Sequence, residues 1–253
     1  MDRQASLYAL FRRCLAADYR HTSLGGDYAL AYDLRHRRLY VLFEWSDGAE
    51  DWHNNLTFFS KTANPKDSKA EQWRCHRGFL KVWSAMKDEI HALASEYIQH
   101  DRAKEISCVG YSHGAALALL ATEHFSHHTS VSVTGYGFGC PRVIKGNLPD
   151  CLQRRLAHFI TIRNASDLVT HLPPAIFGFR HINLTVVGEK GKYSCIEAHT
   201  PQAYLEALRP IKDSSVPHPS YAYGPSADAM KDQNLKEMLP EFAKNINNLA
   251  SSS

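Results

Sequence analysis

The chain has 253 residues, of which 44% are hydrophobic and 22% are charged, and its formal net charge is +3. This length and apolar content are typical of a globular α/β protein of one or two domains with a real core. The small net charge, with acids and bases mixed along the chain, argues against a dedicated nucleic-acid-binding protein, and no apolar run is long enough to span a bilayer.

The first part of the chain predicts a helix followed by a β-hairpin. The N-terminal segment is amphipathic, with one apolar face made of Leu7, Leu10, Phe11, Cys14 and Leu15. Residues 28–32 and 39–45 predict two strands joined by the polar turn 35–38. Residues 61–72 form a polar connector without periodicity, and the apolar spacing over 79–97 predicts a long helix.

The rest of the chain alternates strands with helices. Strands are predicted at 105–109, 130–138, 158–163 and 181–187, and a short helix at 201–208. This alternation favours a largely parallel sheet that is covered by helices on both faces. We expect a single domain over residues 1–253, in which residues 209–253 form a C-terminal loop and helix and a candidate cap.

The N-terminal segment and the cysteines bear on the cellular compartment. An acidic residue and two arginines interrupt the N-terminal segment, which is unlike a secretory signal. The six cysteines form no CxxC pair and no zinc-type spacing, so we expect reduced thiols. These features together predict a cytoplasmic protein, and secretion is the alternative.

The pentad Gly110-Tyr111-Ser112-His113-Gly114 has the G-x-S-x-G pattern of a nucleophile turn. The strand 105–109 leads into it, and strong helix formers follow it, which is the context that the pattern requires. In such a turn the serine has a strained backbone conformation, and the small residues let strand and helix pack closely. We interpret Ser112 as an activated nucleophile. The alternative is a glycine-rich turn with a bystander serine.

A serine nucleophile needs a base and an acid that orients the base, and both follow it on loops after later strands. The later aspartates are Asp150, Asp167, Asp213, Asp228 and Asp232. Asp167 is the candidate acid, because it directly follows the strand 158–163. Its alternative role is that of a turn or cap residue.

Four histidines lie beyond the candidate acid, namely His171, His181, His199 and His218. We select His199 as the base, because it follows the strand 181–187 and precedes a predicted helix. A surface-loop histidine is the alternative. The pair His127-His128 is expected on a polar loop, as surface rather than as a metal site.

A tetrahedral intermediate also needs hydrogen-bond donors for its oxyanion. The backbone N–H of His113, next to the nucleophile, is the first candidate donor. Ser46, at the end of the strand 39–45, is the second, through its backbone N–H and its hydroxyl.

Seven blocks of sequence occur in the order known from one family. They are LYVLFEWS, DWHNNL, CHRGFLKVW, GYSHGAALA, GYGFGCPRV, RNASDLVTHLPP and EAHTPQAYLEAL. Over about residues 28–208 the chain resembles the class 3 lipases, the fungal-type triacylglycerol lipase family of α/β-hydrolases. The resemblance implies an α/β-hydrolase fold with a mostly parallel central sheet.

The resemblance also implies a function. It is that of a carboxylic ester hydrolase, a lipase or esterase, that works through an acyl-enzyme with Ser112, Asp167 and His199 as the triad. Ser46 and His113 are then the oxyanion donors. No metal and no organic cofactor are expected, and the substrate is a small-molecule or lipid ester; the sequence leaves the oligomeric state open. The alternatives are a phospholipase or acyltransferase on the same fold, or a non-catalytic binding protein.

The chain departs from the family pattern in three places. Glu44 and Trp45 replace an arginine and a glycine beside the oxyanion position, and Ala115 replaces a common second glycine. The stretch 57–73, where a lid helix is common, has only two adjacent phenylalanines as an apolar patch. We therefore expect a short polar lid and a preference for soluble or short-chain esters.

Overall fold

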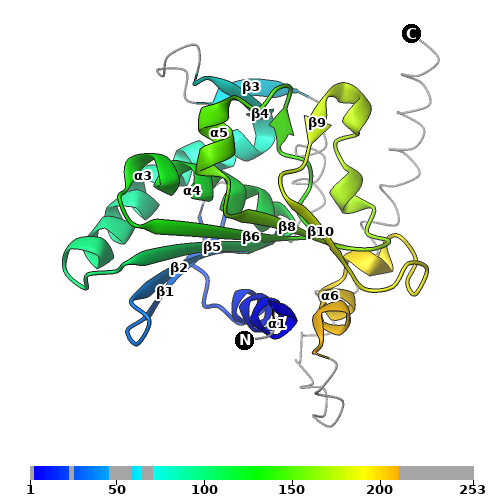
Figure 1. Ribbon diagram of the computed structural model, residues 1–253, viewed down its shortest axis with the longest axis horizontal. Coiled ribbons are helices and arrows are strands. Elements are labelled where there is room, and N and C mark those ends of the chain that lie inside the picture. Colours follow the sequence, from blue (N-terminus) through cyan, green and yellow to red (C-terminus); the bar gives the residue numbers. More distant parts are fainter. Residues whose placement is uncertain (1–2, 23–25, 46–58, 64–70, 211–253) are drawn as a thin grey trace.

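A computed structural model describes residues 3–22, 26–45, 59–63 and 71–210 (Figure 1). Its central element is a six-stranded sheet with the order β1-β2-β5-β6-β8-β10. The bounds of these strands are Tyr28–Asp33, Arg38–Phe43, Glu105–Tyr111, Ser132–Phe138, Phe159–Asn164 and Leu184–Val187. Only the hairpin β1–β2 is antiparallel; every other neighbouring pair of this sheet is parallel.

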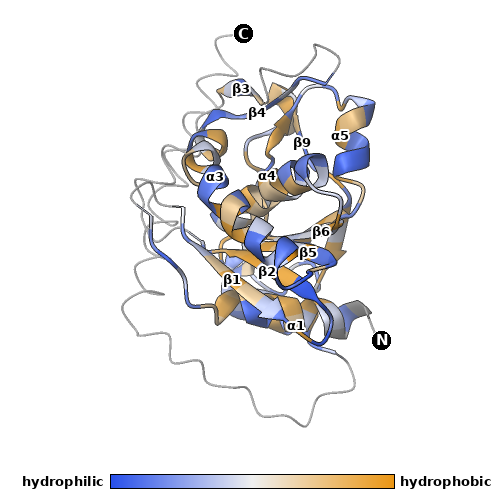
Figure 2. Ribbon diagram, turned by 90° about the vertical axis from the view of Figure 1, so that its left-hand side faces the viewer, coloured by the Kyte–Doolittle hydropathy of each residue, from blue (hydrophilic) through white to orange (hydrophobic). Residues whose placement is uncertain are grey.

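Helices cover both faces of this sheet (Figure 1). One face carries α3 (Arg77–Gln99), α4 (His113–His128) and α5 (Asp150–Arg155), and the other carries α1 (Arg3–Leu15) and α6 (Pro201–Leu208). Helix α4 is almost entirely buried, because it lies between the sheet and α3. The apolar colouring of α4 and of the neighbouring strands in Figure 2 follows from this position. The predicted α/β fold class is confirmed.

A second, four-stranded antiparallel sheet lies at the top of Figure 1. It consists of β3 (Ser60–Ala63), β4 (Trp73–His76), β7 (Ile144–Lys145) and β9 (Phe179–Arg180). This sheet was not predicted, since its strands have only two to four residues and show no clear alternation. Part of it occupies the predicted polar connector 61–72.

The other predicted elements mostly agree with the structure. The N-terminal helix, the hairpin, the long helix and the strands before and after the pentad are confirmed. Strand β10 begins three residues later than predicted, and α5 lies between two predicted strands, where no element was expected. The placement of His127 and His128 on a loop is wrong, because both belong to the last turn of α4. The predicted C-terminal loop and helix, residues 209–253, lies outside the described residues from 211 on, and the single domain over the whole chain stays a prediction.

Helix α1 packs against the strand that carries the pentad. Its apolar face buries Leu7, Phe11 and Cys14, as the periodicity predicted. The Phe11 ring is fully buried, with centroid distances of 5.4 Å to Tyr111, 4.8 Å to Phe138 and 5.7 Å to Tyr204. This N-terminal helix therefore supports the sheet directly beneath the end of β5.

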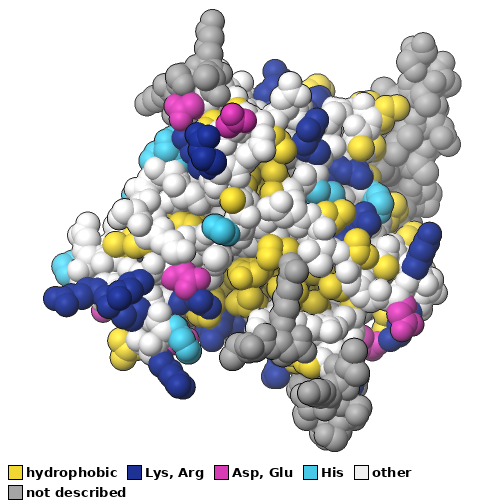
Figure 3. Space-filling model, in the orientation of Figure 1, with side chains coloured by type: hydrophobic (Ala, Val, Ile, Leu, Met, Phe, Trp, Pro, Cys, Tyr) yellow, Lys and Arg dark blue, Asp and Glu magenta, His cyan; other side chains and the backbone are white. Residues whose placement is uncertain are grey.

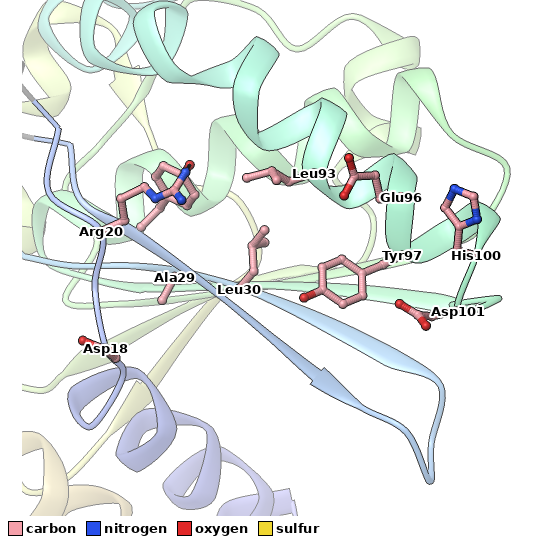
Figure 4. A pocket seen from close by; sticks show the side chains of 10 residues that line it. Asp18, Arg20, Ala29, Leu30, Leu93, Glu96, Tyr97, His100 and Asp101 are labelled. Atoms are coloured by element: carbon pink, nitrogen blue, oxygen red, sulfur yellow. Dashed lines mark hydrogen bonds between the residues drawn. The ribbon is translucent and has the colours of Figure 1, made fainter.

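The surface of the described residues carries mixed charges and a hollow. Basic and acidic side chains are interspersed on the face in Figure 3. A hollow of about 480 Å³ lies between β1 and the C-terminal part of α3 (Figure 4). His100 and Asp101 line this hollow and come just before β5, so the hollow lies toward the amino end of that strand, whereas Ser112 follows the carboxyl end.

Among the helices of the described ranges, none combines the length and apolarity needed to cross a membrane.

Candidate active site

The pentad forms a sharp turn between β5 and α4. Ser112 has backbone angles of φ 55° and ψ −119°, a conformation that non-glycine residues rarely adopt. Its N–H donates to the carbonyl of Phe138 over 2.8 Å, which fixes the turn to the neighbouring strand. Strain of this kind persists only where the surrounding structure enforces it, and it projects the Ser112 side chain beyond the sheet.

The two glycines of the pentad are required by close backbone packing. A Cβ at Gly110 would lie 2.1 Å from the carbonyl oxygen of Gly114. A Cβ at Gly114 would lie 2.4 Å from the carbonyl oxygens of Phe43 and Glu44, at the end of β2. No side chain fits at these distances, so the predicted reason for the small residues is confirmed.

Ser112, His199 and Asp167 form one chain of hydrogen bonds, although they are far apart in sequence. The distance from His199 Nε2 to Ser112 Oγ is 2.9 Å, and that from His199 Nδ1 to Asp167 Oδ2 is 2.8 Å. All three side chains are buried, at 4%, 4% and 0% exposure. This arrangement can move a proton from the hydroxyl to the imidazole, while the carboxylate holds Nδ1–H and stabilises the resulting charge.

Two further partners hold the Asp167 carboxylate. The backbone N–H of Val169 donates to Oδ1 over 2.9 Å, and the Tyr204 hydroxyl donates to Oδ2 over 2.6 Å. Burial, then the charge of Asp167, raises the pKa of Tyr204 well above its usual value, so Tyr204 remains a donor. The same hydroxyl accepts the backbone N–H of Asn164, at the end of β8, over 3.0 Å. Tyr204 thus fixes the loop of Asp167 to the strand before it.

The loop that carries His199 is held by two side chains that the sequence analysis did not select. The Tyr111 hydroxyl donates to the His199 carbonyl oxygen, and the Tyr111 ring stacks on the imidazole at a centroid distance of 5.3 Å. The Asn164 side-chain amide donates to the carbonyl of Ala198 over 3.0 Å. Tyr111 lies inside the pentad and Asn164 directly follows the predicted strand 158–163. Their positions in the sequence were the only signal that could have identified them.

His113 is the first residue of α4, and its backbone N–H and its side chain have different environments. Its backbone N–H is at the first helical position, where it has no partner within the helix and lies at the positive end of the helix dipole. Its imidazole is 5% exposed, and neither ring nitrogen has a hydrogen-bond partner among the described residues. Burial, aided by the nearby His76, lowers the pKa of His113 to about 4.

The remaining candidates do not join this cluster. Asp150 begins α5, His171 contacts Arg163, and His181 bonds to the carbonyl oxygen of Thr170. Ser46, the second predicted oxyanion donor, lies outside the described residues, as do His218 and the aspartates 213, 228 and 232. The role of Ser46 therefore stays a prediction.

In the described ranges, one group of three His, Cys, Asp or Glu side chains has its ligand atoms already close enough to share a metal ion. The ligand atoms of His21, Asp27 and Glu44 lie within 4.8 Å of one another, and His21 Nδ1 is 2.8 Å from Asp27 Oδ2. The His21 side chain is 80% exposed. None of the three belongs to the hydrogen-bonded chain of Ser112.

Comparison with known proteins identifies the family. The profile of the family described as lipase (class 3) matches residues 40–177, more than half of the chain. The chain belongs to the class 3 lipase family. The resemblance drawn from the seven sequence blocks is thereby confirmed.

Individual class 3 lipases match over part of their length. The lipase of Rhizomucor miehei is 27% identical over 57% of this chain and 40% of its own length. Secreted mono- and diacylglycerol lipase 1 of Fusarium solani is 24% identical over 60% of this chain and 44% of its own length. The matches thus span less than half the length of these relatives. Among solved structures, lipase from Rhizopus microsporus var. chinensis is similar in fold, with a TM-score of 0.63 at 16% identity over 75% of this chain and 76% of that one.

The names of the relatives contradict the cytoplasmic localisation expected from the sequence. Relatives from Fusarium solani and Malassezia restricta are named as secreted lipases. The expectation depended partly on the cysteines, and these carry no information about the compartment. Burial raises the pKa of Cys14, Cys75 and Cys108 to about 12, so these thiols are unreactive core residues in any compartment.

Proposed function

We propose that this class 3 lipase is a serine ester hydrolase that works through an acyl-enzyme, with Ser112 as nucleophile, His199 as base and Asp167 as the orienting acid. The observation that carries this proposal is the continuous chain of two hydrogen bonds, 2.9 Å and 2.8 Å long, from hydroxyl to imidazole to carboxylate. The strained turn at Ser112 also supports it, because such a turn presents the hydroxyl to a substrate.

In the first half-reaction His199 Nε2 accepts the Ser112 proton while Oγ attacks the ester carbonyl carbon. The tetrahedral oxyanion lies against the backbone N–H of His113, at the start of α4, and Ser46 is the proposed second donor. The imidazolium then protonates the alcohol oxygen, the ester C–O bond breaks, and the acyl group stays on Ser112. In the second half-reaction His199 deprotonates a water molecule, which attacks the acyl carbon. The bond between Ser112 Oγ and the acyl carbon then breaks, His199 returns the proton to Oγ, and the acid is released.

A fluorophosphonate probe tests this function directly. We expect the probe to label the wild-type protein and to fail with Ser112→Ala. Ser130→Ala is the matched control, since Ser130 is an exposed serine in the same chain and its loss should leave labelling intact. Absence of labelling in the wild-type protein would favour the alternative of a non-catalytic binding protein.

For the substrate class we propose lipid esters of the acylglycerol type, because the relatives include proteins named mono- and diacylglycerol lipases. The predicted short polar lid concerns residues 57–73, most of which lie outside the described residues; Phe59 is described and is 66% exposed. A series of p-nitrophenyl esters of increasing chain length tests the expected preference for short chains. A strong preference for long chains, with a rate increase above the solubility limit, would contradict it.

Phospholipase and acyltransferase activities on the same site are distinguished by their products. Release of free acid from an acylglycerol supports the hydrolase, whereas transfer to an added alcohol in preference to water would indicate an acyltransferase.

A further inference from the structure

Four histidines gather where the exposed end of α4 packs against α3. They are His91 on α3 and His124, His127 and His128 in the last turns of α4. Ring centroids are 5.0 Å apart for His91 and His124, 4.5 Å for His124 and His128, and 4.4 Å for His127 and His128. The cluster is separate from the candidate active site, since the 16 residues of α4 place it roughly 20 Å along the helix from Ser112.

The geometry of the cluster is close to that of a chelating site. His91 Nδ1 and His124 Nε2 are 3.1 Å apart. Two imidazole nitrogens on one tetrahedral metal ion, at about 2.0–2.1 Å from it, are themselves roughly 3.3 Å apart. The two helices therefore already hold two ligand nitrogens near the required separation. His128 is at i+4 from His124, so it lies on the same face of α4. Its ring centroid is 6.2 Å from that of His91, so its exposed side chain has to rotate to bring a third nitrogen to the metal.

A metal ion can replace the hydrogen bond between His91 and His124. A histidine must be neutral when it binds a metal. The proton shared between His91 and His124 only has to move to the other nitrogen of its own ring, because both rings keep one N–H when a metal replaces the hydrogen bond.

Two charged residues face the cluster from α3. Asp88 interacts electrostatically with His91 and His124, and its carboxylate pairs with Lys87 over 2.6 Å. Asp88 is exposed, with 85% of its side chain accessible, and can therefore turn toward a cation. A set of imidazoles with one carboxylate selects Zn²⁺, Cu²⁺ or Ni²⁺ over Ca²⁺ and Mg²⁺, which prefer oxygen ligands.

We propose that His91, His124 and His128 form a binding site for a divalent transition-metal ion, with Zn²⁺ as its representative, that cross-links α3 to α4. Such an ion is a structural cross-link: it binds the folded arrangement of the two helices and not the unfolded chain, so it stabilises the fold. Helix α4 begins at the nucleophile turn, and the cross-link holds the opposite end of this helix in place.

Isothermal titration of tag-free protein with ZnCl₂ tests the site. We expect saturable binding of one Zn²⁺ per chain, at least about tenfold weaker in His124→Asn and in His128→Asn, and a melting temperature that rises with Zn²⁺. His158→Asn is the matched control, because it removes an exposed histidine outside the cluster and should leave the affinity unchanged. CaCl₂ should give no saturable binding.

The proposal fails if the wild-type protein shows no saturable Zn²⁺ binding, or if His128→Asn binds Zn²⁺ as tightly as the wild type. His128 is exposed, so its replacement keeps the test valid even where His124→Asn disturbs folding. Ser112→Ala should bind Zn²⁺ like the wild type, which separates the outcome from that of the proposed ester hydrolysis.

Discussion

Replacement of His113 by leucine should stabilise the protein, although His113 adjoins the nucleophile. Both imidazole nitrogens are buried without a hydrogen-bond partner among the described residues, and an unsatisfied buried polar group costs about 1–3 kcal/mol. Leucine has a similar volume and no polar atom, and it can pack against Phe79, whose ring centroid is 5.6 Å from that of His113. We expect a gain in the free energy of unfolding of about 1–3 kcal/mol at pH 7.

The same substitution should change the acid sensitivity of the fold. The pKa of His113 is about 4 in the folded protein, against 6.5 for an unperturbed histidine. In this window the unfolded chain binds a proton that the folded protein does not, so stability is present above pH 6.5 and decreases as the pH falls toward 4. Between pH 6.5 and 5 the free energy of unfolding falls by about 2 kcal/mol, at 1.36 kcal/mol per pH unit. His113→Leu has no imidazole at this position, so it should not show this loss.

Guanidinium unfolding of the wild type and His113→Leu at pH 7 and pH 5 measures both effects. His158→Leu is the control for removal of an exposed histidine. The reasoning is refuted if His113→Leu is less stable than the wild type at pH 7, or if the two proteins lose equal stability between pH 7 and pH 5.

Three further substitutions test contacts of the site and of α4. Tyr204→Phe removes the donor to Asp167, and it should lower kcat about tenfold, equivalent to roughly 1.4 kcal/mol, with little change in KM in steady-state assays. Gly114→Ala places a Cβ 2.4 Å from carbonyl oxygens at the end of β2 and should cost at least about 3 kcal/mol, measured by chemical denaturation. Arg155→Met removes the cation that pairs at 3.0 Å with the buried carboxylate of Glu123 and should lower stability by about 3 kcal/mol, seen as a lower melting temperature. A melting curve unchanged by Arg155→Met, or a kcat unchanged by Tyr204→Phe, would contradict the corresponding contact.

The residues of the hydrogen-bonded chain were predictable because each is fixed by its place after a strand. Ser112, Asp167 and His199 follow strands of one parallel sheet, and parallel strands bring their carboxyl ends to the same edge. That rule needs only strand positions, which the apolar pattern of the sequence supplies.

The supporting residues depend on contacts that no local pattern encodes. Tyr204 reaches Asp167 because α6 packs below the end of β8, and this packing is known only once the fold is formed. The small sheet was missed for a related reason, since strands of two to four residues are defined by their partners. His127 and His128 were assigned to a loop because a polar end of an otherwise apolar helix has no periodicity of its own.

The position of Phe11 has a practical consequence for anyone who shortens this protein. The family match covers residues 40–177. A fragment trimmed to those limits would keep the pentad but would lose Phe11, so the rings of Tyr111 and Phe138 would be exposed to solvent on the side that Phe11 covers. It would also end before His199. An expression trial guided by the family boundaries alone should therefore give aggregated, inactive material, and the first fifteen residues need to be retained.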